Sequence, residues 1–239
     1  MEHEHVGFVR ARRPEQKQQR REAILDAART LGRESGVRNV TLGSVALAVG
    51  LAKSNVVRYF GTREEIFLEL TAEAWADWER ALTELLGDVG AGSGGAGAAD
   101  GVVAALAQTL AERPFLCDLL SQTALTLEHN VSLEAARVFK RDVIAVVGRL
   151  GARVADAHPE LDASEGAELI SAAAALAGVL YPLSTPPAVM RELYAQEPDI
   201  AAACPELLPT LERSLAALAA GLPTLRGRSV QSGQRSDST

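Results

Sequence analysis

Residues 41–59 contain a helix-capping residue and a helix-breaking glycine whose positions restrict the possible folds of this chain more than any other segment. Thr41 is a residue type that caps helix N-termini, and the segment 42–49 after it carries apolar residues on one helical face. Gly50 interrupts that segment before a second short helical segment at 52–59. Two short helices joined by a tight, glycine-containing turn predict a helix-turn-helix.

Longer helices are predicted on both sides of this motif. In the segment 20–34, apolar residues recur at i, i+4 and i+7 from Ile24, which indicates an amphipathic helix. On the other side, Thr62 and Glu65 have the spacing of a capping box and open a long helix. The sequence therefore predicts a small helical domain over residues 20–65.

Composition supports an all-α fold. Hydrophobic residues make up 47% of the 239 residues and aromatic residues only 4%, so small aliphatic side chains must fill most of the core. This mixture favours closely packed helices over a β-sandwich, which needs strand-forming aromatic residues.

Charge is unevenly distributed along the chain. Residues 1–65 contain 12 Lys and Arg against 8 Asp and Glu, a net charge of +4, whereas the whole chain has a net charge of -7. A basic segment on an acidic chain favours a nucleic-acid partner for the basic part.

The sequence lacks the marks of secreted, metal-binding and membrane proteins. Cys117 and Cys204 lie far apart and have no metal-ligand spacing, so we expect reduced thiols and no metal. Residues 1–21 lack the apolar stretch of a signal peptide, and the longest apolar run, 172–181, is about half of the ~20 residues that a membrane span needs. These features predict a cytoplasmic protein without membrane association.

The sequence also lacks recognisable catalytic motifs. The four histidines have no H-E-x-x-H spacing, no serine has a G-x-S-x-G setting, and no G-x-x-x-x-G-K-[ST] phosphate loop occurs. We therefore expect no catalytic residues, no cofactor and no enzymatic activity.

The remainder of the chain is predicted to be a larger helical domain between flexible ends. Residues 1–19 are predicted to be a flexible basic arm that could follow phosphates, and 223–239 a disordered tail. The larger domain, 66–222, contains seven glycines within 87–101, which predict a flexible loop crossed by no helix. Its helices are expected at 102–112, 114–128, 132–157, 163–181 and 204–220.

The predicted helix-turn-helix has one face for burial and one for contact. The apolar face comprises Val45, Val49, Leu51, Val56 and Phe60. The opposite face of the second helix comprises Lys53, Ser54, Val57 and Arg58. Because that face is short, polar and basic apart from one valine, it suits the major groove of DNA.

Residues 24–70, ILDAARTLGRESGVRNVTLGSVALAVGLAKSNVVRYFGTREEIFLEL, resemble the DNA-binding domain of the TetR family of bacterial repressors. The most specific part is GLAKSNVVRYFGTREEIF, residues 50–67, with a glycine, a short recognition helix, the pair Tyr59-Phe60 and a capped fourth helix. The resemblance implies a dimer that binds double-stranded operator DNA.

The resemblance also implies roles for single residues. Positions that approach base edges or thymine methyls are occupied by Lys53, Ser54, Asn55 and Val57. Positions that contact phosphates are occupied by Thr41, Tyr59 and Arg63. Arg58 could contact phosphate or be a solvated charge, Asn55 could instead bond nearby backbone, and Thr41 and Tyr59 could be structural.

Two residues depart from the family pattern. Gly43 stands where many members carry a polar or basic residue that contacts DNA, so the second helix is expected to contribute less to base contact. Gly32 stands where a large apolar residue is usual late in the first helix, which costs about 1 kcal/mol of helix propensity relative to alanine.

By the same resemblance, the larger domain senses a ligand and forms the homodimer. The predicted interface consists of the helices 163–181 and 204–220, which could instead only complete the monomer core. A small hydrophobic inducer is expected to contact aromatic, aliphatic and amide side chains, each of which could equally be core: Trp75, Trp78, Phe115, Leu119, Gln122, Phe139 and Tyr181.

The predicted function is a ligand-responsive repressor that leaves its palindromic operator when an apolar or amphipathic inducer binds. The alternative is a helix-turn-helix regulator without a small-molecule ligand, controlled by a protein partner or by abundance. A third possibility is an interaction protein in which the helix-turn-helix is only structural.

Overall fold

The computed structural model describes residues 6–92 and 96–226, and within these ranges all regular structure is helical. The chain forms two compact units. The N-terminal unit contains residues up to 71 together with 122–139, and the C-terminal unit contains 72–121 and the residues from 140 onward. The predicted all-α fold, with a small N-terminal helix-turn-helix domain and a larger helical part, is confirmed.

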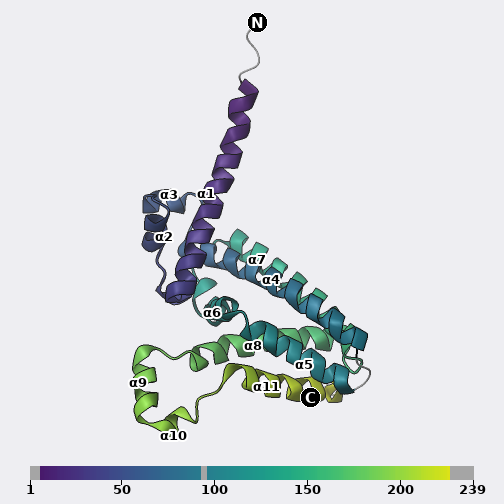
Figure 1. Cartoon of the computed structure of the whole chain (residues 1–239). Helices are drawn as coiled ribbons and strands as arrows, with labels where there is room; N and C mark the ends of the chain where they lie inside the picture. The colour runs from purple at the N-terminus through teal and green to yellow at the C-terminus, as the bar shows by residue number, and fades with distance from the viewer. Residues whose placement is uncertain (1–5, 93–95, 227–239) are drawn as a thin grey trace, which may run out of the picture. The chain divides into compact units, whose positions relative to one another are not determined.

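The N-terminal unit is built on α1 (Val6–Ser35), the 3-10 turn η1 (Val37–Asn39), α2 (Leu42–Ala48), α3 (Lys53–Val57) and the start of α4 (Arg63–Gly92). α1 packs against η1 and α2, and α2 packs against α3 (Figure 1). A later segment joins the unit: the π-helical turn η2 (Thr123–Leu127) and the first residues of α7 (Leu133–Ala157). The core residues of this unit include Ile24, Ala28, Val37, Val45, Val56, Phe60, Ile66, Phe67 and Leu127.

The first helix is longer than the sequence pattern predicts. The apolar periodicity indicates a start near Arg20, but α1 begins at Val6, so the flexible arm predicted for 1–19 is helical from residue 6 onward. Residues 1–5 lie outside the described residues. Side chains 15–20 are all exposed, which explains why periodicity does not reveal this part of the helix. Local propensity sustains it instead, as in the hydrogen bond between Gln18 and Glu22 one turn apart.

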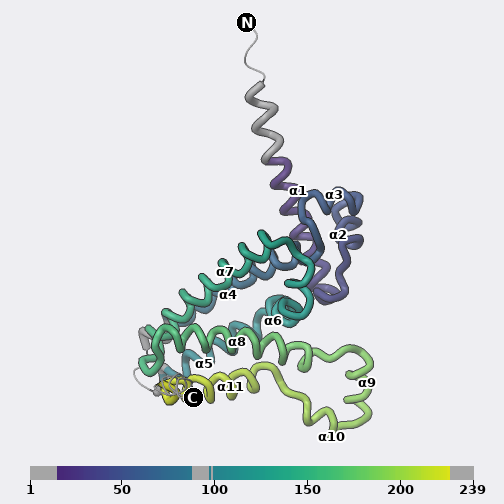
Figure 2. Tube along the Cα trace, turned by 180° about the vertical axis from the view of Figure 1, so that it is seen from behind, coloured from purple at the N-terminus to yellow at the C-terminus, as the bar shows by residue number. Residues whose placement is uncertain are grey.

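The C-terminal unit contains the rest of α4 and α7, together with α5 (Ala96–Ala111), α6 (Pro114–Gln122), α8 (Ala163–Ser184), α9 (Ala188–Gln196), α10 (Pro198–Ala201), α11 (Leu207–Gly221) and the 3-10 turn η3 (Leu222–Leu225). α5, α8 and α11 pack against one another and run side by side in both views (Figures 1 and 2). Their facing side chains supply much of the core, including Leu106, Leu110, Leu169, Ile170, Leu211 and Leu215.

Two close contacts fix the packing of this unit. Trp78 is fully buried, and its Nε1 donates a hydrogen bond to Thr109 Oγ1 at 2.9 Å, so its one polar atom is satisfied inside the core. α7 crosses α8 at two glycines: a Cβ added to Gly151 would lie 2.6 Å from Ala167 N, and one added to Gly166 would lie 2.2 Å from Gly151 O. Only glycine permits this approach of the two backbones.

Three further boundaries differ from expectation. The glycine-rich segment 87–101 is predicted to be a loop, yet α4 continues to Gly92 and α5 begins at Ala96, while residues 93–95 lie outside the described residues. Each glycine costs a helix about 1 kcal/mol relative to alanine, and the long packed helices on both sides offset that cost. The tail predicted for 223–239 is wrong at its start, because η3 continues to Leu225 and the Arg226 guanidinium bonds Glu165, while residues 227–239 lie outside the described residues.

α8 is the one helix in the described ranges that is long and apolar enough to cross a membrane by length and composition. Nine of its residues are buried within the C-terminal unit, among them Leu169, Ala173 and Ala177. Burial in a helical core therefore accounts for its apolar character.

Candidate nucleic-acid interface

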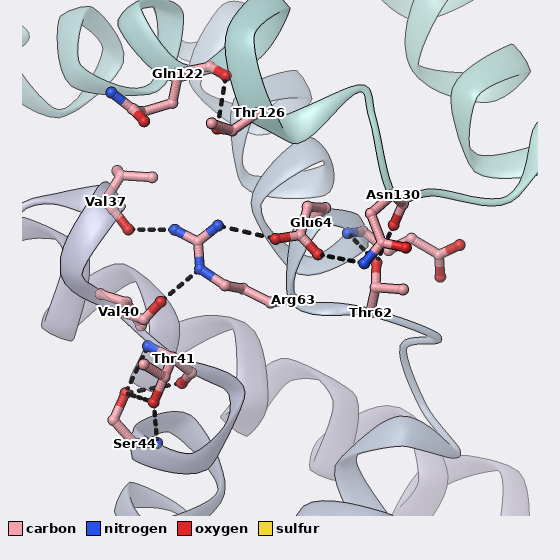
Figure 3. Close-up of polar contacts among 11 residues, drawn as sticks. Val37, Val40, Thr41, Ser44, Thr62, Arg63, Glu64, Gln122, Thr126 and Asn130 are labelled. Atoms are coloured by element: carbon pink, nitrogen blue, oxygen red, sulfur yellow. Dashed lines mark hydrogen bonds and ion pairs between the residues drawn. The ribbon is translucent and has the colours of Figure 1, made fainter.

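The helix-turn-helix is held at its start by a capping box. Thr41 Oγ1 accepts a hydrogen bond from Ser44 N, and Ser44 Oγ accepts one from Thr41 N, both at 3.0 Å (Figure 3). These bonds satisfy two backbone donors that the helix itself leaves unpaired. Thr41 therefore has the structural role considered for it, and its phosphate contact stays a prediction.

The turn between α2 and α3 depends on Gly50. This residue has φ +65°, in the left-handed region that non-glycine residues rarely adopt. Its N–H bonds Leu47 O at 3.1 Å, and Leu51 N–H bonds Ala46 O at 2.9 Å, which is the Schellman pattern that ends a helix sharply. The chain then enters α3 after three residues.

α3 presents the predicted contact residues to solvent. Lys53, Ser54, Asn55 and Arg58 are exposed, and Val57 is 42% exposed although it is apolar. On the other face, Val56 is fully buried. An exposed valine amid polar and basic side chains is what contact with a thymine methyl requires, so the burial pattern agrees with the predicted roles without testing them.

The residues around α3 differ in their exposure. Tyr59 is half-buried, so its ring contributes to packing as well as to the surface. Phe60 is buried under the guanidinium of Arg21, which lies 4.4 Å from the ring centroid and pairs with Glu69. This arrangement ties α1 and α4 to the end of the recognition segment.

Arg63 points into the N-terminal unit. Its Nε donates to Val40 O at 2.5 Å, its Nη2 donates to Val37 O, and its Nη1 pairs with Glu64 at 3.1 Å (Figure 3). The guanidinium also lies over the ring of Phe67, and the side chain is 17% exposed. Nε and Nη2 thus hold the segment that leads into α2, and the phosphate contact of Arg63 stays a prediction.

The start of α4 is also joined to the segment between η2 and α7. Thr62 Oγ1 donates to Asn130 O at 2.7 Å, and Asn130 Nδ2 donates to Glu64 Oε2 at 3.2 Å (Figure 3). Ser132 N donates to Glu65 Oε1 at 2.9 Å. A continuous set of hydrogen bonds therefore runs from Asn130 through Glu64 and Arg63 to the carbonyls before Thr41.

The carboxylate of Glu65 is held in its charged form. Burial raises its pKa. Hydrogen bonds from the backbone and side chain of Ser132 and from Gly61 N–H together lower the pKa by more than burial raises it, so the pKa lies below its usual value of 4.5. The Glu65 side chain thus links the turn before α4 to the turn before α7 as a charged acceptor.

Sequence reasoning missed these partners. Asn130 and Ser132 lie more than 60 residues from the α4 residues that they bind, and no local pattern indicates the pairing. The spacing of Thr62 and Glu65 does mark the start of α4, where Glu65 N donates to Thr62 Oγ1 at 3.1 Å, but this local pattern does not predict a long-range partner. The resemblance places Arg63 at a family position, but it carries no information on where the guanidinium donors point.

The predicted ligand residues are divided between the two units. Trp75, Trp78, Phe115, Leu119 and Tyr181 belong to the C-terminal unit, and Gln122 and Phe139 to the N-terminal unit. Trp75 and Trp78 meet edge to face at 5.3 Å, and both are buried in the core of their unit, as is Leu119. Phe115 and Tyr181 are half-buried.

Tyr181 is the polar member of the set that lies in the C-terminal unit. Burial, followed by the nearby charge of Asp118, raises the pKa of its phenol. α6 and α8 are close here, since a Cβ on Gly178 would come within 3.2 Å of Leu120 and Ser121. Phe115, Leu119 and Tyr181 therefore lie on neighbouring helices.

A capped helix-turn-helix with an exposed basic recognition helix, followed by a separate helical unit, defines a helical DNA-binding transcription regulator. The family model described as "Bacterial regulatory proteins, tetR family" matches residues 24–70, and that described as "Tetracyclin repressor-like, C-terminal domain" matches 72–226. The chain belongs to the TetR family of bacterial transcription regulators.

Solved structures with the same fold include two proteins named FadR, of which the one from Bacillus halodurans is described as a fatty acid degradation regulator. FadR from Bacillus halodurans is 16% identical over 84% of this chain and 94% of that chain, with a TM-score of 0.51. FadR from Thermus thermophilus, a TetR-family repressor solved with lauroyl-CoA, is 16% identical over 84% of this chain and 93% of that chain, with a TM-score of 0.52. At this identity the likeness shows a shared fold. No curated protein matches the chain.

Proposed function

We propose that this chain is a cytoplasmic, homodimeric repressor that binds a palindromic operator through α3 and leaves it when a small apolar or amphipathic molecule binds. The observation that carries the proposal is the exposed face of Lys53, Ser54, Asn55, Val57 and Arg58 beside Val56, which is fully buried. Lysine can donate to guanine, asparagine can pair with adenine, and valine can contact a thymine methyl.

The proposed dimer uses the faces of α8 and α11 that the monomer core leaves uncovered. On α8 the exposed stripe is small and apolar toward its C-terminal end, with Ala175, Val179 and Leu183. On α11 the exposed residues include Ala216 and Ala220. Small side chains at helical spacing allow two copies to pack as a four-helix bundle around a two-fold axis.

The bundle can be tested without disturbing the monomer. Leu211 and Ala174 are buried in the core, so glutamate there would unfold the unit. Ala175→Glu places the charge on the exposed stripe instead, and Ala152→Glu, at an exposed position of α7, is the matched control. We expect only Ala175→Glu to give folded monomers in sedimentation velocity; a dimeric Ala175→Glu variant would contradict the interface.

Ligand release is proposed to act through the hydrogen bonds at the start of α4. The segment 122–132 begins with the π-helical turn, in which Thr126 Oγ1 bonds Gln122 O at 3.0 Å (Figure 3). Its end bonds Thr62, Glu64 and Glu65, and Arg63 bonds the carbonyls that precede α2. A ligand that favours another arrangement of this segment would lower DNA affinity, because only differential binding shifts such an equilibrium.

The decisive experiment measures operator binding and its response to ligand. Fluorescence anisotropy with DNA from upstream of the chain's own gene should show salt-dependent binding that Lys53→Ala weakens. Arg80→Ala, which removes a cation that is 79% exposed in the C-terminal unit, is the matched control and should leave affinity unchanged. Binding that Lys53→Ala does not alter would contradict the assignment of α3.

The ligand panel should begin with fatty acids and acyl-CoA esters, because the Thermus thermophilus FadR of the same fold was solved with lauroyl-CoA. An inducer should change the fluorescence of Trp75 and Trp78 over the same concentrations at which it releases DNA. If DNA binding holds but no member of a broad apolar panel changes fluorescence, melting temperature or affinity, control by a protein partner or by abundance replaces the ligand part of the proposal.

A further inference from the structure

The connection between α8 and α11 forms an arm, residues 185–206, that carries α9 and α10. In both views this arm extends beyond the ends of α8 and α11 (Figures 1 and 2). No residue of α9 or α10 is buried. The arm is thus an ordered part of the C-terminal unit that has no core of its own.

The arm's internal bonds are local. Arg191 Nη1 donates to Pro186 O at 2.7 Å, and Cys204 Sγ donates to Ile200 O at 3.8 Å. Helices of nine and four residues are much shorter than the ~12–15 residues at which an isolated helix becomes marginally stable in water. Two such helices without buried side chains need an external surface to stay ordered.

The arm carries apolar side chains suited to such a surface. Val189 on α9 is 69% exposed and Ile200 on α10 is 43% exposed. The exposed stripe of α8 runs into the arm, since Val179 is 63% and Leu183 50% exposed. The apolar surface of the arm therefore continues the surface that the proposed dimer covers.

We propose that the arm docks on the partner subunit of the homodimer, where Val189 and Ile200 become buried beside the α8–α11 face. This inference rests on the dimer of the proposed function. α9 is about 13 Å long at ~1.5 Å per residue, enough to cross one helix of the partner at the usual separation of about 8–10 Å. A second copy of the chain is the favoured partner of the arm, because the arm begins and ends on the two helices of the proposed interface and its apolar surface adjoins theirs.

Charge also favours a second copy. The arm contains four acidic residues against one arginine: Glu192, Glu197, Asp199, Glu206 and Arg191. Arg213 is exposed on α11, on the same side as the small residues of the proposed interface. An acidic arm beside a partner's exposed arginine is electrostatically complementary.

The first test compares the dimerisation of two glutamate variants, one on the arm and one on α7. Val189→Glu and Ile144→Glu both alter an apolar side chain that is 69% exposed, the first on the arm and the second on α7. Neither should change monomer folding, measured by circular dichroism. We expect Val189→Glu to raise the dimer dissociation constant about tenfold or more and Ile144→Glu to leave it unchanged, measured by sedimentation velocity across a dilution series. Equal dissociation constants for Val189→Glu and the unmodified chain would overturn the proposal.

Hydrogen exchange provides a second test that does not depend on a substitution in the arm. Amides of residues 188–201 should be protected in the dimer and exchange rapidly in the monomeric Ala175→Glu variant, while amides of α5 keep their protection. Arm protection that is the same in monomer and dimer would show that the chain covers its own arm, and the proposal would fail. A chain that never dimerises would instead refute the dimer itself, so the two failures are distinguishable.

Discussion

Arg63→Ala should destabilise the N-terminal unit strongly, because the Arg63 side chain holds the segment before α2. Its guanidinium donates to two backbone carbonyls, Val37 O and Val40 O, and lies over the ring of Phe67. The substitution removes all these contacts at once. Arg63→Lys keeps the positive charge but cannot place two donors in a fixed fork.

The size of the effect follows from these contacts. A hydrogen bond from a charged group contributes about 1.5–3 kcal/mol and a cation–π contact about 0.5–1 kcal/mol. The side chain is 17% exposed, so water can reach the freed carbonyls in part and the loss is smaller than the sum. We expect Arg63→Ala to lower the unfolding free energy of this unit by about 2–4 kcal/mol, and Arg63→Lys to recover less than half of that.

Hydrogen exchange of amides in α1 and α2 measures this loss, since both tryptophans lie in the C-terminal unit and do not report on the N-terminal one. Operator affinity over a range of salt concentrations separates the two roles of the arginine. Loss of a phosphate contact reduces the slope of log binding constant against log salt concentration by about 0.9, whereas loss of a positioning residue leaves this slope unchanged. Unchanged exchange together with a lower slope would refute the inward role. Arg58→Ala, at an exposed position, is the control that should show the opposite pattern.

The remaining predictions concern packing, burial and pH. Gly151→Ala should cost about 1–3 kcal/mol in urea unfolding because its Cβ would meet backbone at 2.6 Å, whereas Gly148→Ala, with nothing within 4 Å, should stabilise by up to about 1 kcal/mol. Thr109→Val should cost about 1–3 kcal/mol by leaving buried Trp78 Nε1 unpaired, which thermal unfolding measures. The lowered pKa of Glu65 adds stability above about pH 4.5 that is lost as pH falls below it, so Glu65→Gln should flatten the acid limb of a pH–stability curve. Equal effects of Gly151→Ala and Gly148→Ala would contradict the packing prediction. An unshifted melting temperature of Thr109→Val, or an unchanged acid limb in Glu65→Gln, would contradict the other two.

The sequence predicted those parts of the fold that local chemistry determines. Thr41 caps α2 as its residue type indicates, and Gly50 adopts the left-handed conformation that the turn requires. The exposed and buried faces of α3 follow from its periodicity, so Val56 faces the core and Lys53 the solvent. Helix boundaries set by caps and turn residues were within a few residues of those observed.

The parts that depend on tertiary context could not be predicted in this way. The helices across the glycine-rich segment are sustained by packing on both sides, which composition does not reveal. The inward direction of Arg63 depends on carbonyls of η1, and the bond between Asn130 and Glu64 joins segments far apart in the chain. α9 was missed because prolines mark its ends and none of its residues is buried to create a periodic pattern.

We propose that the exposed face of α3 reads a palindromic DNA sequence. Selection of binding sites from a random DNA pool tests it most directly, followed by the affinities of Lys53→Ala and Asn55→Ala for the selected site. We expect one enriched two-fold symmetric sequence, and for each variant a loss of about 1–3 kcal/mol in binding free energy with relaxed preference at the contacted base pair. A pool without enrichment, or two folded variants that keep full affinity and preference, would contradict it.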